Sequence, residues 1–260
     1  PKQSGGKKAT LNKLNNFLKQ EEPKTVEILV TNLHAQGNSV TYKELREAYL
    51  AGGLTEKQFT TWQKKYSKLV EDTLKPEWEK AAALAAQEAK NKYPYFLYEP
   101  GVGAAADWIK QHGAELVTNL AADQVEALNA IIGHVSGYTA ITPDEAARIM
   151  RPCIGLTKPQ ALANARYREA VKDAYLKAHP NGKPETAEKK AQEAAARYAA
   201  RQHRYRAQSI ARTELAYGYN AGVYGATKDA QAQGYIGDCV KVWVTAYDER
   251  VCPICSQMDE

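Results

Sequence analysis

Two cysteines near the end of the sequence, Cys252 and Cys255, are the side chains best placed to do chemistry. They stand in the order Cys-Pro-Ile-Cys, and this spacing lets two thiolates share one tetrahedral metal ion while supplying half of its ligands. The residues just before them include Tyr-Asp-Glu-Arg, which has no apolar run and predicts a tight turn into a cysteine knuckle. The pattern predicts half of a structural zinc site, with an unmetallated turn as the alternative.

A second group that could do chemistry is a pair of carboxylates, Glu214 and Asp248. Such a pair can hold a metal ion or exchange protons, but Arg212 and Arg250 stand close to them in the sequence. We therefore favour a charge network that pins a strand to a helix. Two polar side chains would add hydrogen bonds to this network: Thr213 and Asn220.

No sequence pattern of a familiar catalytic centre is present. The chain lacks a glycine-rich phosphate loop followed by Lys-Ser/Thr, a His-Glu-x-x-His and a Gly-x-Ser-x-Gly, and its five histidines are scattered. We therefore assign no catalytic residue and expect the protein not to be an enzyme.

The helix that would position Glu214 carries an unusual row of glycines. Residues three and four apart share a helix face, so Gly218, Gly222 and Gly225 form one seam with Glu214. Each glycine costs a helix roughly 1 kcal/mol relative to alanine. The row is best explained if another element packs closely against it, and we expect that element to be the strand that follows.

One alternating segment predicts the only strands of the chain, between residues 239 and 251. Its small apolar residues would face one side: Val240, Val242, Val244 and Ala246. Its larger residues would face the other: Lys241, Trp243 and Thr245. This period of two is typical of a strand with one buried face.

The rest of the sequence predicts a mainly α fold, a multi-helix body with long helices. A Thr followed three residues later by Glu or Gln is the pattern of a capping box, which opens a helix. It occurs at four positions: Thr41, Thr55, Thr142 and Thr157. Pro76 is expected to start a new helix after one that ends near Leu74, and Pro184 to begin a very long one that reaches about Gln233.

The clearest interruption of the helical pattern is the segment 93–103, with two prolines, two glycines and four aromatic residues. We place a domain boundary there, with a helical region at 1–95 and a helical body plus carboxyl-terminal domain at 96–260. The aromatic side chains form either a docking surface or a plug between two helical layers. Two isolated cysteines, Cys153 and Cys239, are expected to be buried small hydrophobic residues.

The order of the motifs resembles the minor head proteins of tailed bacteriophages, in the Mu F-like head-morphogenesis family. Arg-Thr-Glu on a helix is followed by Asn-x-Gly and then by Lys-x-Trp-x-Thr-Ala-x-Asp-x-Arg-x-Cys-x-x-Cys. The matching residues are Arg212, Thr213, Glu214, Asn220, Gly222, Lys241, Trp243, Thr245, Ala246, Asp248, Arg250, Cys252 and Cys255. The resemblance is strong over residues 204–259, weaker over 155–168, and absent before about residue 95.

The resemblance implies a structural protein of the virion, made in the bacterial cytoplasm and placed in the head interior or at the portal vertex. Its partners would be the portal protein and capsid proteins, and it would act in head assembly and in DNA packaging or ejection. Family members continue past the cysteine pair with Asp-Gly and a later segment rich in His and Cys. The chain therefore looks truncated in mid-domain, and downstream residues are expected to complete the zinc site.

Charge leaves two alternatives open, a stand-alone protein that binds double-stranded DNA and a non-catalytic part of a metal nuclease or fused enzyme. The formal net charge is +5, from 35 Lys and Arg against 30 Asp and Glu. The long helix carries basic side chains between Tyr198 and Tyr205 and around them: Arg197, Arg201, His203, Arg204, Arg206 and Arg212. They form either a surface for phosphates or a solvated face paired with Glu188 and Glu193. No apolar run approaches 18 residues, so we expect no membrane span. Since no active site is recognisable, we also expect no small-molecule substrate.

Overall fold

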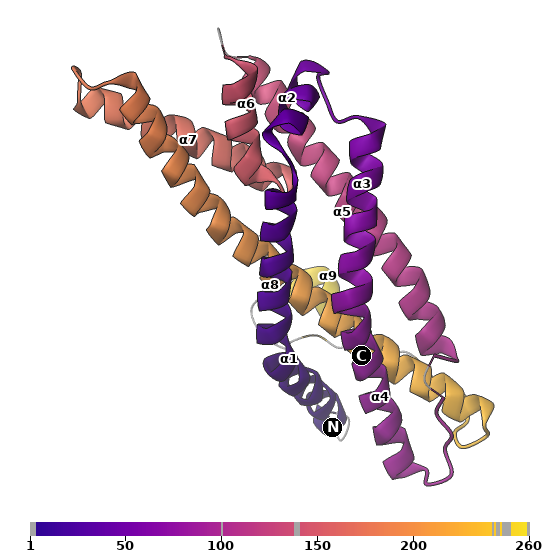
Figure 1. Cartoon of the computed structure of the whole chain (residues 1–260). Coiled ribbons are helices and arrows are strands. Elements are labelled where there is room, and N and C mark those ends of the chain that lie inside the picture. Colours follow the sequence, from indigo (N-terminus) through magenta and orange to yellow (C-terminus); the bar gives the residue numbers. More distant parts are fainter. Residues whose placement is uncertain are drawn as a thin grey trace. The chain divides into compact units, whose positions relative to one another are not determined.

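The computed structural model of the chain is mainly helical, as predicted (Figure 1). It describes residues 4–99, 101–137, 141–240, 242, 245 and 251–258, with the side chains of residues 4–8 and of Thr10 left aside. The elements are α1 (Ser4–Ser39), α2 (Tyr42–Leu50), α3 (Glu56–Leu69), η1 (Val70–Leu74), α4 (Lys75–Lys92), α5 (Ala104–Ser136), α6 (Pro143–Met150), η2 (Arg151–Cys153), α7 (Lys158–Ala178), α8 (Pro184–Ala232) and α9 (Pro253–Met258). None of the described helices holds an apolar stretch long enough to cross a bilayer.

The chain groups into two units, each assembled from segments far apart in the sequence. Unit 1 consists of Pro1–Pro23, Pro76–Lys110 and Arg212–Glu260, and unit 2 of Lys24–Lys75 and Gln111–Ala211. The sequence-based division at residue 95 stays a prediction.

Each unit has its own buried core. In unit 1, Phe17 of α1, Ala81 of α4 and Tyr219 of α8 are buried together. In unit 2, α2 packs against α6. The largest fully buried side chains of unit 2 are Leu29, Leu33, Leu45, Tyr66, Leu74, Leu128, Ile131, Met150, Ile154 and Leu156.

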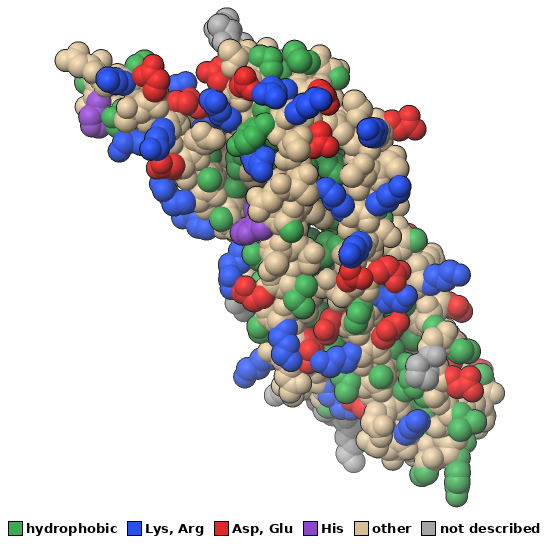
Figure 2. All heavy atoms as spheres, viewed as in Figure 1, with side chains coloured by type: hydrophobic (Ala, Val, Ile, Leu, Met, Phe, Trp, Pro, Cys, Tyr) green, Lys and Arg blue, Asp and Glu red, His purple; other side chains and the backbone are tan. Residues whose placement is uncertain are grey.

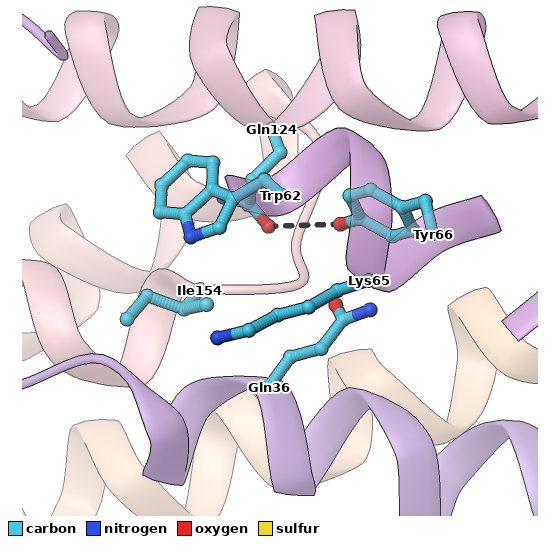
Figure 3. Close-up of a pocket in the computed structure, with 6 residues that line it drawn as sticks. All are labelled: Gln36, Trp62, Lys65, Tyr66, Gln124 and Ile154. Carbon is cyan, nitrogen blue, oxygen red and sulfur yellow. Dashed lines mark hydrogen bonds between the residues drawn. The ribbon is translucent and has the colours of Figure 1, made fainter. Parts of the chain in front are cut away.

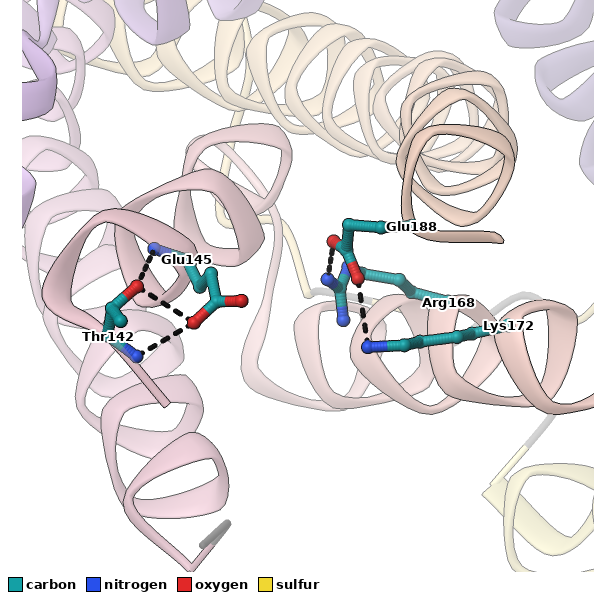
Figure 4. Close-up of polar contacts among 5 residues, drawn as sticks. All are labelled: Thr142, Glu145, Arg168, Lys172 and Glu188. Atoms are coloured by element: carbon teal, nitrogen blue, oxygen red, sulfur yellow. Dashed lines mark hydrogen bonds and ion pairs between the residues drawn. The ribbon is translucent and has the colours of Figure 1, made fainter. Parts of the chain in front are cut away.

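The four predicted capping boxes all open helices, because threonine satisfies amide groups that have no partner within the first turn. At the start of α6 the Thr142 hydroxyl accepts the Glu145 amide at 3.2 Å, and the Glu145 carboxylate accepts the Thr142 amide at 2.8 Å (Figure 4). That backbone hydrogen bond holds the pKa of the Glu145 carboxyl below its usual value.

The helix break expected at Pro76 is wrong, since α3, η1 and α4 follow one another without a gap. Val70–Leu74 forms a π-turn instead, and the Lys75 amide donates to the carbonyl of Val70. Proline has no amide to donate, and its ring clashes with the carbonyl four residues earlier in an α-helix. A wider turn just before Pro76 accommodates the ring and lets the helix continue.

The predicted strand between residues 239 and 251 is not borne out. The described residues of this segment lie in no strand: Cys239, Val240, Val242, Thr245 and Val251. The others lie outside the described residues: Lys241, Trp243, Val244 and 246–250. A strand is held by hydrogen bonds to a neighbouring strand, and the described part of the chain contains none. An alternating sequence predicts that one face of a strand would be apolar, but it does not provide a second strand to form the hydrogen bonds.

Replacing Thr142 by alanine removes the hydroxyl that caps α6. An N-cap threonine contributes about 1 kcal/mol to stability, so Thr142→Ala should lower the free energy of unfolding by roughly that amount in urea denaturation. Thr60→Ala is the matched control, because Thr60 is exposed inside α3 and its hydroxyl donates to the Glu56 carbonyl of the same helix. A loss of equal size in both variants would contradict the capping role.

Candidate functional site

The glycine seam of α8 lies against helices of unit 1, so the expectation that a following strand covers it is wrong. A Cβ atom added at Gly222 would lie 2.7 Å from the Ala82 Cα of α4. One added at Gly225 would lie 2.7 Å from the Ala105 Cβ of α5. Close backbone contact was predicted correctly, because glycine is the residue that permits it, but the partners are two helices.

A buried tryptophan of α4 covers the first glycine of the seam. Trp78 is almost fully buried, and its ring carbon Cδ1 would lie 2.5 Å from a Cβ atom at Gly218. Its indole N–H donates to the Glu214 carbonyl at 3.0 Å, and its ring meets Trp108 edge-on with centroids 5.7 Å apart. Trp78 therefore joins α8 to α4 and α5, a role that no local sequence pattern indicated.

Only some of the remaining motif residues lie in the described part of the chain. Glu214 is buried, whereas Arg212, Thr213 and Asn220 are exposed on α8. Five motif residues lie outside the described residues: Lys241, Trp243, Ala246, Asp248 and Arg250. The charge network between Glu214 and Asp248 therefore stays a prediction.

The cysteine pair forms the start of α9. The Cys255 amide donates to the Cys252 sulfur at 3.3 Å, and the Ser256 amide donates to the Cys252 carbonyl at 2.9 Å. The backbone hydrogen bond from Cys255 lowers the pKa of the Cys252 thiol, and the side-chain hydrogen bond to Cys252 raises that of Cys255. Among the described residues, no group of three His, Cys, Asp or Glu side chains could hold a metal ion.

The two isolated cysteines differ from each other. Cys153 is fully buried, as expected, and burial raises the pKa of its thiol to about 12. Cys239 is exposed, so the expectation that it is buried is wrong. It lies in an irregular segment at the point where the strand was predicted to begin.

The aromatic interruption is buried in part, as the plug alternative predicts, and the docking alternative stays a prediction. Phe96 is buried against Ala86 and Ala230, as a plug would be. Its neighbours point outward, with Tyr95 82% and Leu97 73% exposed. A turn precedes Phe96, whose amide donates to the Tyr93 carbonyl at 2.9 Å.

Gln233, just beyond the end of α8, holds the Leu97 backbone on both sides. Its side-chain oxygen accepts the Leu97 amide at 2.9 Å, and its side-chain nitrogen donates to the Leu97 carbonyl at 2.8 Å. The Gln233 side chain thus pairs with both backbone polar groups of Leu97, as a neighbouring strand would. We call Tyr95 and Leu97, together with this support, the apolar platform. The sequence did not mark Gln233, because an amide pairing with a distant backbone leaves no local pattern.

The basic residues of α8 do not form one surface. His203 and Arg206 are buried in unit 2, and Arg206 donates to the Gly155 carbonyl at 2.8 Å and pairs with Asp123 at 3.0 Å. His203 donates through Nε2 to the Ile154 carbonyl at 2.7 Å, and burial lowers its pKa to about 4, so the ring is neutral at pH 7.

The expected pairing of these basic residues with Glu188 is also not found. Glu188 pairs with Arg168 and Lys172 of α7 (Figure 4). The exposed Arg204 pairs with Glu27 at 2.8 Å. Acidic and basic side chains are interspersed over the face shown in Figure 2. These contacts weaken the hypothesis of a basic strip for phosphates along α8.

The loop that contains Ile154 and Gly155 is also held by a buried amide side chain, that of Gln124 (Figure 3). Its oxygen accepts hydrogen bonds from the Gly155 amide and from the Tyr66 hydroxyl, the latter at 3.3 Å. Burial raises the pKa of Tyr66 to about 12, so the hydroxyl keeps its proton as a donor. The adjoining cavity of about 10 Å³ has room for one water molecule at most. This cluster is a packing device, too small to hold a substrate.

No family model, curated protein or solved structure matches the chain. The resemblance to the Mu F-like family therefore rests on the sequence motif.

Adding a methyl group at Gly222 should strain the seam. The Cβ atom would meet backbone atoms of Ala81 and Ala82, which cannot rotate away, so Gly222→Ala should lower the free energy of unfolding by about 1–3 kcal/mol. Gly133→Ala is the matched control, because Gly133 is exposed in α5 with nothing within 4 Å. Alanine there should raise stability by up to about 1 kcal/mol. Urea denaturation in which both variants gain stability would contradict close packing at Gly222.

Proposed function

We propose that the chain is a structural minor head protein of a tailed bacteriophage or prophage. It binds the portal and neighbouring capsid subunits and acts in head assembly and in DNA packaging or ejection. The apolar platform is the observation that carries this proposal, since it provides a surface for contact. The motif from Arg212 to Cys255 is what points to the phage family.

Exposure and rigidity together support a docking role for the platform. Tyr95 and Leu97 face solvent, while the buried Phe96 and the amide of Gln233 hold the backbone between and beside them. Exposed apolar side chains that lie together commonly mark protein interfaces. Side chains on an ordered backbone lose little conformational entropy when they bind, so more of the contact free energy remains as affinity.

We propose further that Cys252 and Cys255 supply two ligands of a structural zinc ion, with the other ligands from outside the described residues. The thiolate is the form of cysteine that binds zinc, and the amide of Cys255 stabilises a thiolate at Cys252. Both thiols lie within one turn of chain, as two ligands of a tetrahedral ion require. The ion would hold this turn in place.

Removing the platform side chains should weaken portal binding. Tyr95→Ser with Leu97→Ser deletes the apolar contact but keeps the backbone hydrogen bonds to Gln233, so the fold should be retained. Central interface residues contribute about 2 kcal/mol or more each, and the variant should bind the purified portal protein at least about tenfold more weakly by surface plasmon resonance.

The matched control for the platform is Tyr205→Ser with Leu50→Ser. These side chains are 68% and 71% exposed and belong to unit 2. Replacement of both Cys252 and Cys255 by serine should also leave portal binding intact. Unchanged binding by the platform variant, with a loss in either of the other two, would place the docking surface elsewhere.

Zinc should copurify with the protein expressed from its complete gene. Mass spectrometry is expected to find one zinc ion per chain, lost in Cys252→Ser and in Cys255→Ser because each removes one of four ligands. Cys239→Ser is the matched control, since Cys239 is exposed but outside the pair, and it should retain the metal. A metal-free protein whose two thiols react freely with an alkylating agent would refute the zinc site.

A further inference from the structure

Unit 2 contains an open pocket of about 350 Å³ with an unusual combination of lining residues. Its walls come from α1, α2, α6 with η2, and α8. The apolar part of the lining consists of Leu33, Pro152, Ile154, Ala196, Ala199 and Ala200. This volume lies in the range of small-molecule and peptide side-chain pockets, about 300–1,000 Å³.

The charged lining residues of the pocket are all cationic. Arg148 and Arg151 line it, and no Asp or Glu does so among the described residues. Two imidazoles, His34 and His203, add hydrogen-bonding groups and meet edge-on with centroids 5.5 Å apart. The pocket therefore has a positive potential with no acidic residue in its lining to compensate it.

The two guanidinium groups differ in how they are held. Arg151 donates to the Val40 carbonyl at 3.0 Å and lies 4.5 Å from the centre of the Tyr42 ring, so its position is set in advance. Arg148 is exposed and makes no ion pair within the described part of the chain. The two acidic residues of α6 have other partners: Asp144 pairs with Arg46 at 2.6 Å, and the Glu145 carboxylate accepts a hydrogen bond from the Thr142 amide at 2.8 Å.

We propose that this pocket binds a carboxylate carried on an apolar group. Guanidinium groups bind carboxylates through charge-assisted hydrogen bonds, and the alanine and aliphatic lining favours an apolar body next to the acid. A bare phosphate would leave that lining in contact with water. The site is independent of the proposed head-protein function, because it lies wholly in unit 2 and shares no residue with the platform or the cysteine pair.

Binding of 4-phenylbutyrate, followed by amide shifts in ¹H–¹⁵N NMR spectra, tests the class of ligand. A probe of this size should bind with a Kd on the order of 1 mM, and its uncharged amide should bind at least about tenfold more weakly. Arg148→Gln should weaken binding of the acid by about tenfold. Arg197→Gln is the matched control, since Arg197 is exposed on α8 but does not line the pocket.

A second variant keeps the test decisive if Arg148→Gln misfolds. Ala196 is exposed at the pocket, and Ala196→Glu places there a carboxylate that repels the acid. This variant should weaken binding of 4-phenylbutyrate about as much as Arg148→Gln does. Equal binding of acid and amide, or equal affinities of Arg148→Gln and Arg197→Gln, would overturn the proposal. Saturable binding of inorganic phosphate with the same dependence on Arg148 would overturn the carboxylate class.

Two probes distinguish the sources of such a carboxylate. One is the free acid, and the other is a capped peptide in which one Asp stands between two Leu residues. Tighter binding of the peptide by about tenfold or more would support a segment of a partner protein as the occupant. Tighter binding of the free acid would support a small organic acid. Absence of binding by both would refute the pocket as a ligand site.

Discussion

Close backbone contact along the glycine seam of α8 is the constraint on which unit 1 depends. Helices usually keep apart by the width of their side chains, and α8 comes nearer to α4 and α5 because Gly222 and Gly225 have no Cβ atom. The approach allows the Trp78 indole to reach a carbonyl of α8. The end of α8 also lies next to the segment between α4 and α5, where the Gln233 side chain accepts a hydrogen bond from the Leu97 amide.

Unit 2 depends on a different device, a clamp of polar side chains on the short connection before α7. Gly155 takes a positive φ of 87° there, and its amide and carbonyl bond to Gln124 and Arg206. The Ile154 carbonyl bonds to His203. Buried polar groups cost stability unless they are paired, so each of these side chains is committed to the fold and unavailable to a phosphate surface. Two other cations, Arg148 and Arg151, line the pocket instead.

Local patterns and distant contacts were predictable to different degrees. The four threonine caps open their helices because a capping box involves groups only three residues apart. The row of glycines correctly predicted that another element packs closely against α8. It could not predict which element, since a glycine indicates that space is needed and not what fills it. The basic row on α8 could not be divided into buried and exposed members, because arginine and histidine face inward only where a distant carbonyl or carboxylate meets them.

By itself, then, the amino-acid sequence determined that the protein is mainly helical, where four of its helices begin, and that α8 must lie close to another backbone. These properties follow from propensities and hydrogen bonds within a single turn of chain. Only the tertiary structure decided that α4 and α5 cover the seam, that Phe96 faces in while Tyr95 and Leu97 face out, and that Arg148 and Arg151 share one pocket. Each of these features depends on the packing of segments that are far apart in the sequence.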